Sequence, residues 1–297
     1  MIVSIENSES ARPQTGLNQA DIVYEFTVES HITRFQALFN DTYPQFVGPV
    51  RSARYYFIKM QKEWAGMYIH VGYGPPRGEY RLNEDDIVLH MTSGGITAGT
   101  RNSSYFWRTD DKKKREHTLM VNLAQAVADK TAELDPPRHQ RFLFDEGVTY
   151  EDGAAFSVIH MKYTTKKADK LEYKYDPATN KLSRYEYGEQ FMVRTPAAAE
   201  RTYTVEPLSV QNLIVQYADY SFIKGDNKGR RMVEMIGTGK CDYFVNGQHV
   251  TGYWARPDED QPTTYYLDNG EVVTLEMGNT WIAVYPDDEE SAIIIDP

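Results

Sequence analysis

The sequence predicts an α+β fold, in which a mixed amino-terminal α+β domain (residues 1–200) precedes a smaller, mainly antiparallel β domain (residues 205–297). The first observation is periodicity: the first two thirds mix helical and strand spacing, whereas short strand-like runs separated by turns follow residue 205. The second is charge, because residues 205–297 hold 6 basic and 16 acidic residues and carry −10 of the net −11. The third is size: 297 residues, 41% of them hydrophobic, can bury one large core or two smaller ones.

A β-hairpin is predicted first. Residues 21–30 alternate apolar and polar side chains, residues 32–39 form the partner strand, and Ser30-His31 is the expected two-residue turn. This register places Glu25 opposite Gln36 and Thr27 opposite Arg34. Because cross-strand partners share a face of the sheet, we expect one polar face, made of Glu25, Thr27, Glu29, Arg34 and Gln36.

Two helices are predicted in the same domain. One covers about residues 52–64, where apolar side chains recur at helical spacing. The other covers residues 123–134, because Asn122 can cap its amino terminus with Gln125 at the third helical position, and Pro136-Pro137 stops it.

The remaining predicted elements are β-hairpins. Residues 171–187 form one around residues 176–180, with Tyr173 and Tyr185 on one face. Asn246-Gly247 and Asp268-Asn269-Gly270 tolerate positive φ at a hairpin tip and mark turns of the β domain. Its strands are expected at 211–217, 232–237, 240–245, 248–255, 263–268, 271–275 and 279–285.

Composition excludes several classes of protein. A net charge of −11 argues against sequence-independent nucleic-acid binding, which needs many cationic contacts to phosphates. The single cysteine, Cys241, excludes an intrachain disulfide and any multi-cysteine metal site. No run approaches the ~18 apolar residues of a membrane span, and no signal peptide opens the chain, so we expect either a cytosolic protein or one whose leader has been removed.

Motif matches for enzymes fail on inspection. Gly237-Thr238-Gly239-Lys240 lacks the remaining residues of a phosphate-binding loop. Ser221-Phe222-Ile223-Lys224 matches Ser-x-x-Lys but lies in a strand context, whereas such a nucleophile opens a helix. Asp287 to Glu290 is expected to be a solvated acidic segment and not a calcium site. We therefore assign no catalytic residue, metal or cofactor, and expect no Ser–His or Cys–His pair in hydrogen-bond contact.

The segment Gly48 to Arg54 favours anion binding. A helix that begins near Ser52 leaves its first backbone amides unpaired. Arg51 and Arg54 flank this point, so both guanidinium groups can converge on one carboxylate or phosphate. The alternative is that Ser52 only caps the helix and the arginines pair with nearby Asp or Glu.

The carboxylates of the first hairpin have two interpretations. Four strand residues separate Glu25 from Glu29 by ~13 Å, beyond the ~5–9.5 Å of a glycosidase pair. A ligand-binding face together with Arg34 is one interpretation. A solvated Glu–Arg–Glu cluster, worth at most ~1 kcal/mol per pair, is the other.

Four motifs in order resemble the YerB-like putative lipoproteins of Gram-positive bacteria, a domain family of unknown function. The motifs are Ala11-Arg12-Pro13-Gln14-x-Gly16-Leu17, Ala20 to Glu25, Ile32-Thr33-Arg34 and Gly48 to Arg54. The resemblance implies site roles for Arg12, Glu25, Arg34, Arg51, Ser52 and Arg54. His70 and His117 are secondary candidates.

The resemblance also implies an exported protein, held by a lipid on an amino-terminal Cys that this chain lacks. The leading hypothesis is a non-catalytic extracytoplasmic lipoprotein that binds an anionic cell-envelope component or an envelope protein. It needs no cofactor or nucleic acid, and it meets the membrane only through that anchor. One alternative is an envelope-acting hydrolase or transferase with Glu25 or His70 as base. Another is an assembly module that docks through its acidic β domain.

Overall fold

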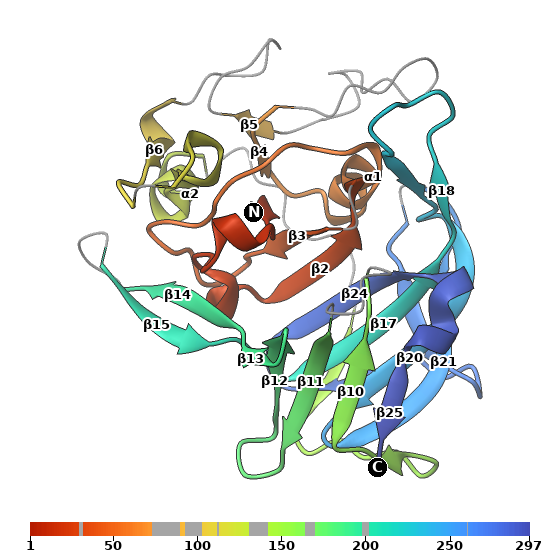
Figure 1. The fold of residues 1–297 in the computed structure, drawn as a ribbon. Coiled ribbons are helices and arrows are strands. Elements are labelled where there is room, and N and C mark those ends of the chain that lie inside the picture. The colour runs from red at the N-terminus through yellow and green to blue at the C-terminus, as the bar shows by residue number, and fades with distance from the viewer. Residues whose placement is uncertain are drawn as a thin grey trace.

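Two β-sheets dominate the computed structural model, which describes residues 1–29, 32–72, 90–92, 103–111, 113–130, 142–163, 170–197, 202–259 and 261–297. The larger sheet is mixed, and the smaller is antiparallel (Figure 1). The predicted α+β class with an antiparallel carboxyl-terminal part is confirmed.

The large sheet joins strands from both ends of the chain. Its centre is parallel, because β24 pairs in parallel with β17 on one side and with β2 on the other. The order is β22 (Thr264–Leu267), β21 (Gln248–Arg256), β20 (Gly237–Val245), β17 (Asn212–Ala218), β24 (Thr280–Pro286), β2 (Ile22–Thr27), β3 (Thr33–Leu38), β1 (Ile2–Glu6), β4 (Tyr68–His70) and β5 (His90–Thr92), with β9 (Ala154–Ala155) beside β21.

The second sheet packs on one face of the large sheet. Ile159, Tyr173 and Leu182 from the small sheet share a buried core with Phe35 and Trp281 from the large one, so apolar side chains fill the space between the sheets. The small sheet has the order β13 (Glu189–Gln190), β12 (Lys181–Glu186), β11 (Leu171–Asp176), β10 (Val158–Met161) and β25 (Ile294–Asp296), with β16 (Ser209–Val210) beside β12.

Helix α1 (Tyr55–Trp64) covers the opposite face of the large sheet. Its Phe57 packs against Phe26 of β2 at 5.2 Å between ring centroids. The remaining elements are α2 (Leu123–Lys130) and the pairs β14 (Met192–Pro196) with β15 (Tyr203–Pro207), β18 (Tyr220–Phe222) with β19 (Arg231–Val233), β8 (Leu143–Asp145) with β23 (Thr274–Glu276), and β6 (Phe106–Arg108) with β7 (Leu119–Val121). Short 3₁₀ helices cover Glu9–Ala11, Leu17–Gln19, Ser103–Tyr105, Arg115–His117 and Asp287–Ala292.

Most predicted elements form close to their expected positions. The strands of the β domain are present, and Asn246 and Gly247 adopt positive φ at the predicted turn. Asn122 caps α2 as expected, because its side chain accepts a hydrogen bond of 3.0 Å from the Gln125 backbone N–H. The predicted end of this helix, residue 134, lies outside the described residues.

Two local predictions within residues 1–64 are wrong. In the first hairpin Val28 N–H donates to Ile32 O, and the pairs are Glu25 with Phe35 and Phe26 with Arg34. A shift of one residue moves a side chain to the other face, so Glu25 and Arg34 lie on opposite faces of the sheet and the expected polar face does not form. Helix α1 begins at Tyr55 and not at Ser52.

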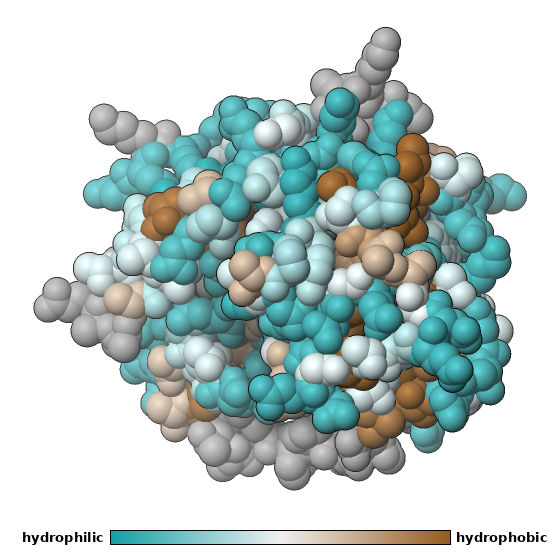
Figure 2. All heavy atoms as spheres, turned by 90° about the horizontal axis from the view of Figure 1, so that it is seen from below, coloured by the Kyte–Doolittle hydropathy of each residue, from teal (hydrophilic) through white to brown (hydrophobic). Residues whose placement is uncertain are grey.

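The predicted boundary near residues 200–205 does not separate the sheets. Strand β24 lies between β17 and β2, and β25 completes the small sheet beside β10. Pairing across the boundary therefore joins the two predicted domains, and the division of the chain near residues 200–205 stays a prediction. Seen from below, the molecule is mainly hydrophilic, with apolar residues in small separate groups (Figure 2). Among the described residues no helix has the length and apolar character to cross a membrane.

Cys241 is buried in β20. Burial raises the pKa of its thiol well above the ordinary value, and the thiolate is the reactive form. We expect the native protein to react with a thiol reagent such as Ellman's reagent at least 100-fold more slowly than the denatured chain. Rapid reaction of the native protein at pH 8 would contradict this.

Candidate functional site

The carboxyl ends of β1 and β4, which are parallel neighbours, meet the segment that precedes α1. Arg51 N–H donates to Ser4 O at 2.8 Å, and Val71 N–H donates to Arg51 O at 3.0 Å. Ligands often bind beyond the carboxyl ends of parallel strands. Four predicted residues gather here and are called the arginine site: Arg34, Arg51, Ser52 and Arg54.

Arg34 is the most buried member of the arginine site, with 3% of its surface exposed. It pairs across the sheet with Glu6 and donates to Ser52 O at 3.1 Å. Its Nε has no hydrogen-bond partner, and within the described part of the chain no carboxylate forms an ion pair with it. Burial, together with the nearby charges of Arg54 and Arg51, lowers the pKa of Arg34 to about 10. Glu29, which Arg54 binds, is the carboxylate whose charge acts on Arg34 in the opposite sense. Among the described residues, the site thus holds a buried cation that makes no direct ion pair.

The other two arginines of the site have carboxylate partners. Arg54 forms a bidentate ion pair with Glu29: its Nη2 contacts Glu29 Oε1, and its Nε lies 3.1 Å from Glu29 Oε2. Although burial opposes it, the Arg54 charge holds the pKa of Glu29 below its ordinary value. Arg51 Nε lies 3.2 Å from Glu6 Oε2. The arginines are therefore brought together as predicted, but pairing within the fold satisfies two of them.

His70 borders the arginine site but is completely buried. Its Nδ1 lies 3.3 Å from Gly72 O, and its ring stacks on Tyr68 at 4.9 Å. The same Gly72 carbonyl accepts from the Ala53 backbone N–H at 3.0 Å. His70 therefore supports the walls of the site and has no solvent access for proton exchange with a ligand.

His117 lies in a second polar group, together with Glu6, Ser8 and Ser10. Its Nδ1 is 2.8 Å from Glu6 Oε2, and its Nε2 is 3.1 Å from Ser10 Oγ. Ser8 donates to the other Glu6 oxygen at 2.7 Å. The expectation of no Ser–His pair in hydrogen-bond contact is therefore wrong. Residues 107 positions apart form the pair, and no sequence motif joins them.

Glu25 and Arg12 lie outside the arginine site. Glu25 is 0% exposed and forms a bidentate ion pair with Arg184 of β12, with distances of 2.6 and 2.9 Å. Trp281 Nε1 and Thr33 Oγ1 donate to the same carboxylate at 3.0 and 2.6 Å. Glu186 also pairs with Arg184, and Arg12 Nη2 lies 2.5 Å from Glu186 Oε2, so Arg12 extends this network toward the surface. Glu25 is thus a structural residue between the sheets.

Sequence reasoning missed Glu6 and Arg184. Glu6 ends the apolar strand β1, and a charged residue at the end of a buried strand is a signal that could have identified it. Arg184 pairs with Tyr173 across the second hairpin. In the register predicted from sequence, Tyr185 lies on the same face as Tyr173. Arg184 would then point away from the core, so it is absent from the predicted site residues.

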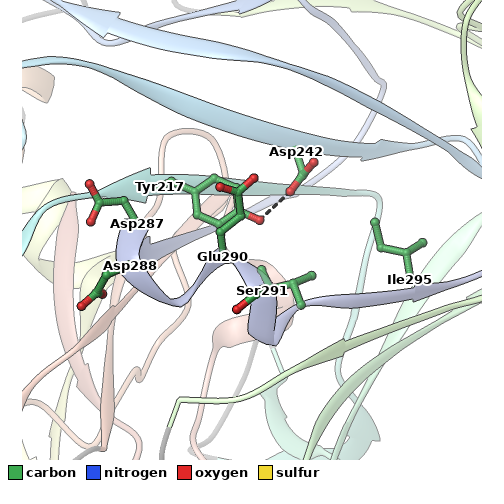
Figure 3. Close-up of a pocket in the computed structure, with 8 residues that line it drawn as sticks. Tyr217, Asp242, Asp287, Asp288, Glu290, Ser291 and Ile295 are labelled. Atoms are coloured by element: carbon green, nitrogen blue, oxygen red, sulfur yellow. Dashed lines mark hydrogen bonds between the residues drawn. The ribbon is translucent and has the colours of Figure 1, made fainter.

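The acidic β domain has an open pocket of ≈ 550 Å³ (Figure 3). Tyr217 donates to Asp242 at 2.6 Å beside acidic residues of the last 3₁₀ helix, and burial with the Asp242 charge raises the Tyr217 pKa. Among the described residues no group of three or more His, Cys, Asp or Glu side chains is placed to hold a metal ion. The pocket is lined by Tyr217, Asp242, Asp287, Asp288, Glu290, Ser291, Ile293 and Ile295.

Models of the two domains of one protein family match this chain. Residues 1–136 match the amino-terminal domain, and residues 159–282 the carboxyl-terminal domain, of a protein of unknown function (DUF3048). The "Putative lipoprotein YerB" of Bacillus subtilis (strain 168) is 28% identical over 293 residues, which cover 98% of this chain and 82% of that protein. The crystal structure of YerB from Bacillus subtilis matches with a TM-score of 0.77 at 27% identity, covering 100% of this chain and 93% of that one.

Proposed function

Because this chain belongs to the DUF3048 family, carries both of its domains and is a distant homologue of the "Putative lipoprotein YerB" of Bacillus subtilis, we propose that it is an extracytoplasmic lipoprotein that binds an anionic component of the cell envelope at the arginine site. In this proposal a lipid on a preceding Cys anchors the protein, and the described domains lie outside the membrane. The family relationship supports the location, and the arginine site supports the ligand.

The unpaired charge of Arg34 carries the proposal. Removing a guanidinium group from water without a direct ion pair is costly. Arg54 and Arg51 repel its charge, whereas Glu29, which is already bound by Arg54, attracts it. A carboxylate or phosphate that contacts Arg34 would offset that cost through charge-assisted hydrogen bonds. Arg51, with 26% of its side chain exposed, is the most accessible of the three arginines of the site.

The two residues first considered as catalytic bases, Glu25 and His70, do not suit that role. Glu25 is held by Arg184, Trp281 and Thr33, and His70 has no exposed surface. Neither can exchange a proton with a bound substrate and solvent. A hydrolase that uses Glu25 or His70 is therefore not supported.

We predict that Arg34→Gln abolishes anion binding at little cost in stability. A bound anion stabilises the folded state in proportion to RT ln(1 + [L]/Kd), so sulfate and inorganic phosphate should raise the melting temperature of the wild type above its value in chloride of equal ionic strength. The variant should lose this rise, because it loses the unpaired cation.

Lys240→Gln provides the matched control, since it removes one positive charge from an exposed position in the β domain. It should keep the full stabilisation by phosphate. The free energy of unfolding of Arg34→Gln should stay within about 1 kcal/mol of the wild type. A loss of several kcal/mol with unchanged phosphate binding would show that Arg34 is a structural residue and would refute the proposal.

A further inference from the structure

We propose that Ser10 is the nucleophile of an acyl-transfer site in which His117 is the general base and Glu6 orients it. The substrate class is a carboxylic ester that also carries an anionic group. This inference goes beyond the binding function: it shares Arg51 with the arginine site, but the proposed catalytic group, Ser10, His117 and Glu6, does not include Arg34.

The geometry of the three side chains fits the roles. Ser10 Oγ lies 3.1 Å from His117 Nε2, and His117 Nδ1 lies 2.8 Å from Glu6 Oε2. A nucleophile in contact with a base that a third group orients is the signature of activated serine. Since the Glu6 carboxylate can only accept, Nδ1 carries the proton and Nε2 is left as an acceptor for the Ser10 hydroxyl.

Burial also separates the roles. Glu6 and His117 are 2% and 5% exposed, whereas Ser10 lies at the surface. Ser8 Oγ donates a hydrogen bond to Glu6 Oε1, and His117 Nδ1 contacts Glu6 Oε2, so both carboxylate oxygens are hydrogen-bonded. A fixed, buried carboxylate stabilises the imidazolium that forms when His117 takes a proton. Glu116, at 3.5 Å from Nε2, is farther away than Ser10.

Two cations support the group. Lys113 donates to the carbonyl oxygens of Ala11 and Arg12 at 3.1 and 2.6 Å. It thereby ties the segment that carries Ser10 to the segment that carries His117. Arg51 is partly exposed and pairs with Glu6 through Nε at 3.2 Å, while its Nη1 lies 3.5 Å from Glu116 O. Its Nη2 would bind the anionic group of the substrate beside the ester.

The reaction balances without a cofactor. Ser10 Oγ bonds to the ester carbonyl carbon while its proton passes to His117 Nε2. His117 then returns the proton to the leaving alkoxide as the ester C–O bond breaks, which gives an acyl-serine and an alcohol. Water attacks the acyl-serine, again with its proton passing through His117, and releases the carboxylic acid and free Ser10.

Fluorophosphonate labelling of the full chain, followed by intact mass and peptide mapping, tests the assignment. An activated serine displaces fluoride and retains one phosphonyl group, so we expect one adduct on Ser10. Ser10→Ala should remove it, and Ser221→Ala, which alters an exposed serine of β18 outside this polar group, should keep the full labelling rate. His117→Gln should slow labelling at least 100-fold.

Hydrolysis of p-nitrophenyl succinate, an anionic ester, is the second measurement. The wild type should release p-nitrophenol faster than Ser10→Ala, whose exposed substitution leaves the fold intact by circular dichroism. No adduct, or an adduct retained in Ser10→Ala, would overturn the proposal. The adduct on Ser10 and the stabilisation by phosphate are separate measurements on the wild type, so failure of the anion-binding proposal and failure of this one give different results.

Discussion

Replacing Arg184 with methionine is expected to lower the free energy of unfolding by about 3–5 kcal/mol, because it leaves the Glu25 carboxylate buried without its counter-ion. Arg184 is 1% exposed. Tyr173, Glu186 and Glu25 all contact its guanidinium group, at 2.5–2.9 Å. Burial disfavours the charge, but Glu25, Tyr173 and Glu186 together outweigh this effect and hold the pKa of Arg184 above its ordinary value. Urea unfolding of wild type and variant measures the difference.

Lys181→Met is the matched control, since it removes one charge from an exposed position of the same strand β12. It should change stability by less than about 0.5 kcal/mol. The double variant Glu25→Gln/Arg184→Met should lose less than the sum of the single variants, because a neutral amide can still accept from Trp281 and Thr33. A loss below about 1 kcal/mol for Arg184→Met would contradict the structural role of the pair.

The ion pair also shows where sequence reasoning reached its limit. The existence of the hairpin at residues 171–187 follows from local chemistry, as Asp176 and Asn180 favour a turn. The face on which each side chain lies depends on one residue of turn length. The observed pairing of Asp176 with Lys181 sets Arg184 opposite Tyr173, and this register is decided by burial between the sheets, which is not a local property.

The same reason explains the first hairpin. Strand alternation identified the strands correctly, but a connection one residue longer than expected moved Arg34 away from Glu25 and next to Ser52. Arg51, Ser52 and Arg54 are neighbours in sequence, so their association was predictable. Contacts such as Ser10 with His117 join distant segments, and no single-sequence pattern encodes them.

Expressed alone, residues 205–297 are expected to remain unfolded, although their strands were the most predictable in the chain. Hairpin formation among β20, β21 and β22 is local and needs only turn signals. Strand β24, however, lies between β17 and β2, and five of its backbone positions pair with β2. Trp281 of β24 is fully buried against Phe35 and Arg184 of the amino-terminal part. The isolated fragment would expose this edge and both sheet faces.

Tryptophan emission and circular dichroism measure the outcome. The fragment contains Trp254 and Trp281, both buried in the whole protein, so its emission should shift to longer wavelength and its thermal melt should lack a cooperative transition. Mixing it with residues 1–204 should restore buried emission, because β2 and the small sheet then supply the missing partners. A cooperative melt of the fragment alone would show instead that the β domain folds independently, and that the pairing of β24 with β2 is a docking contact between two stable units.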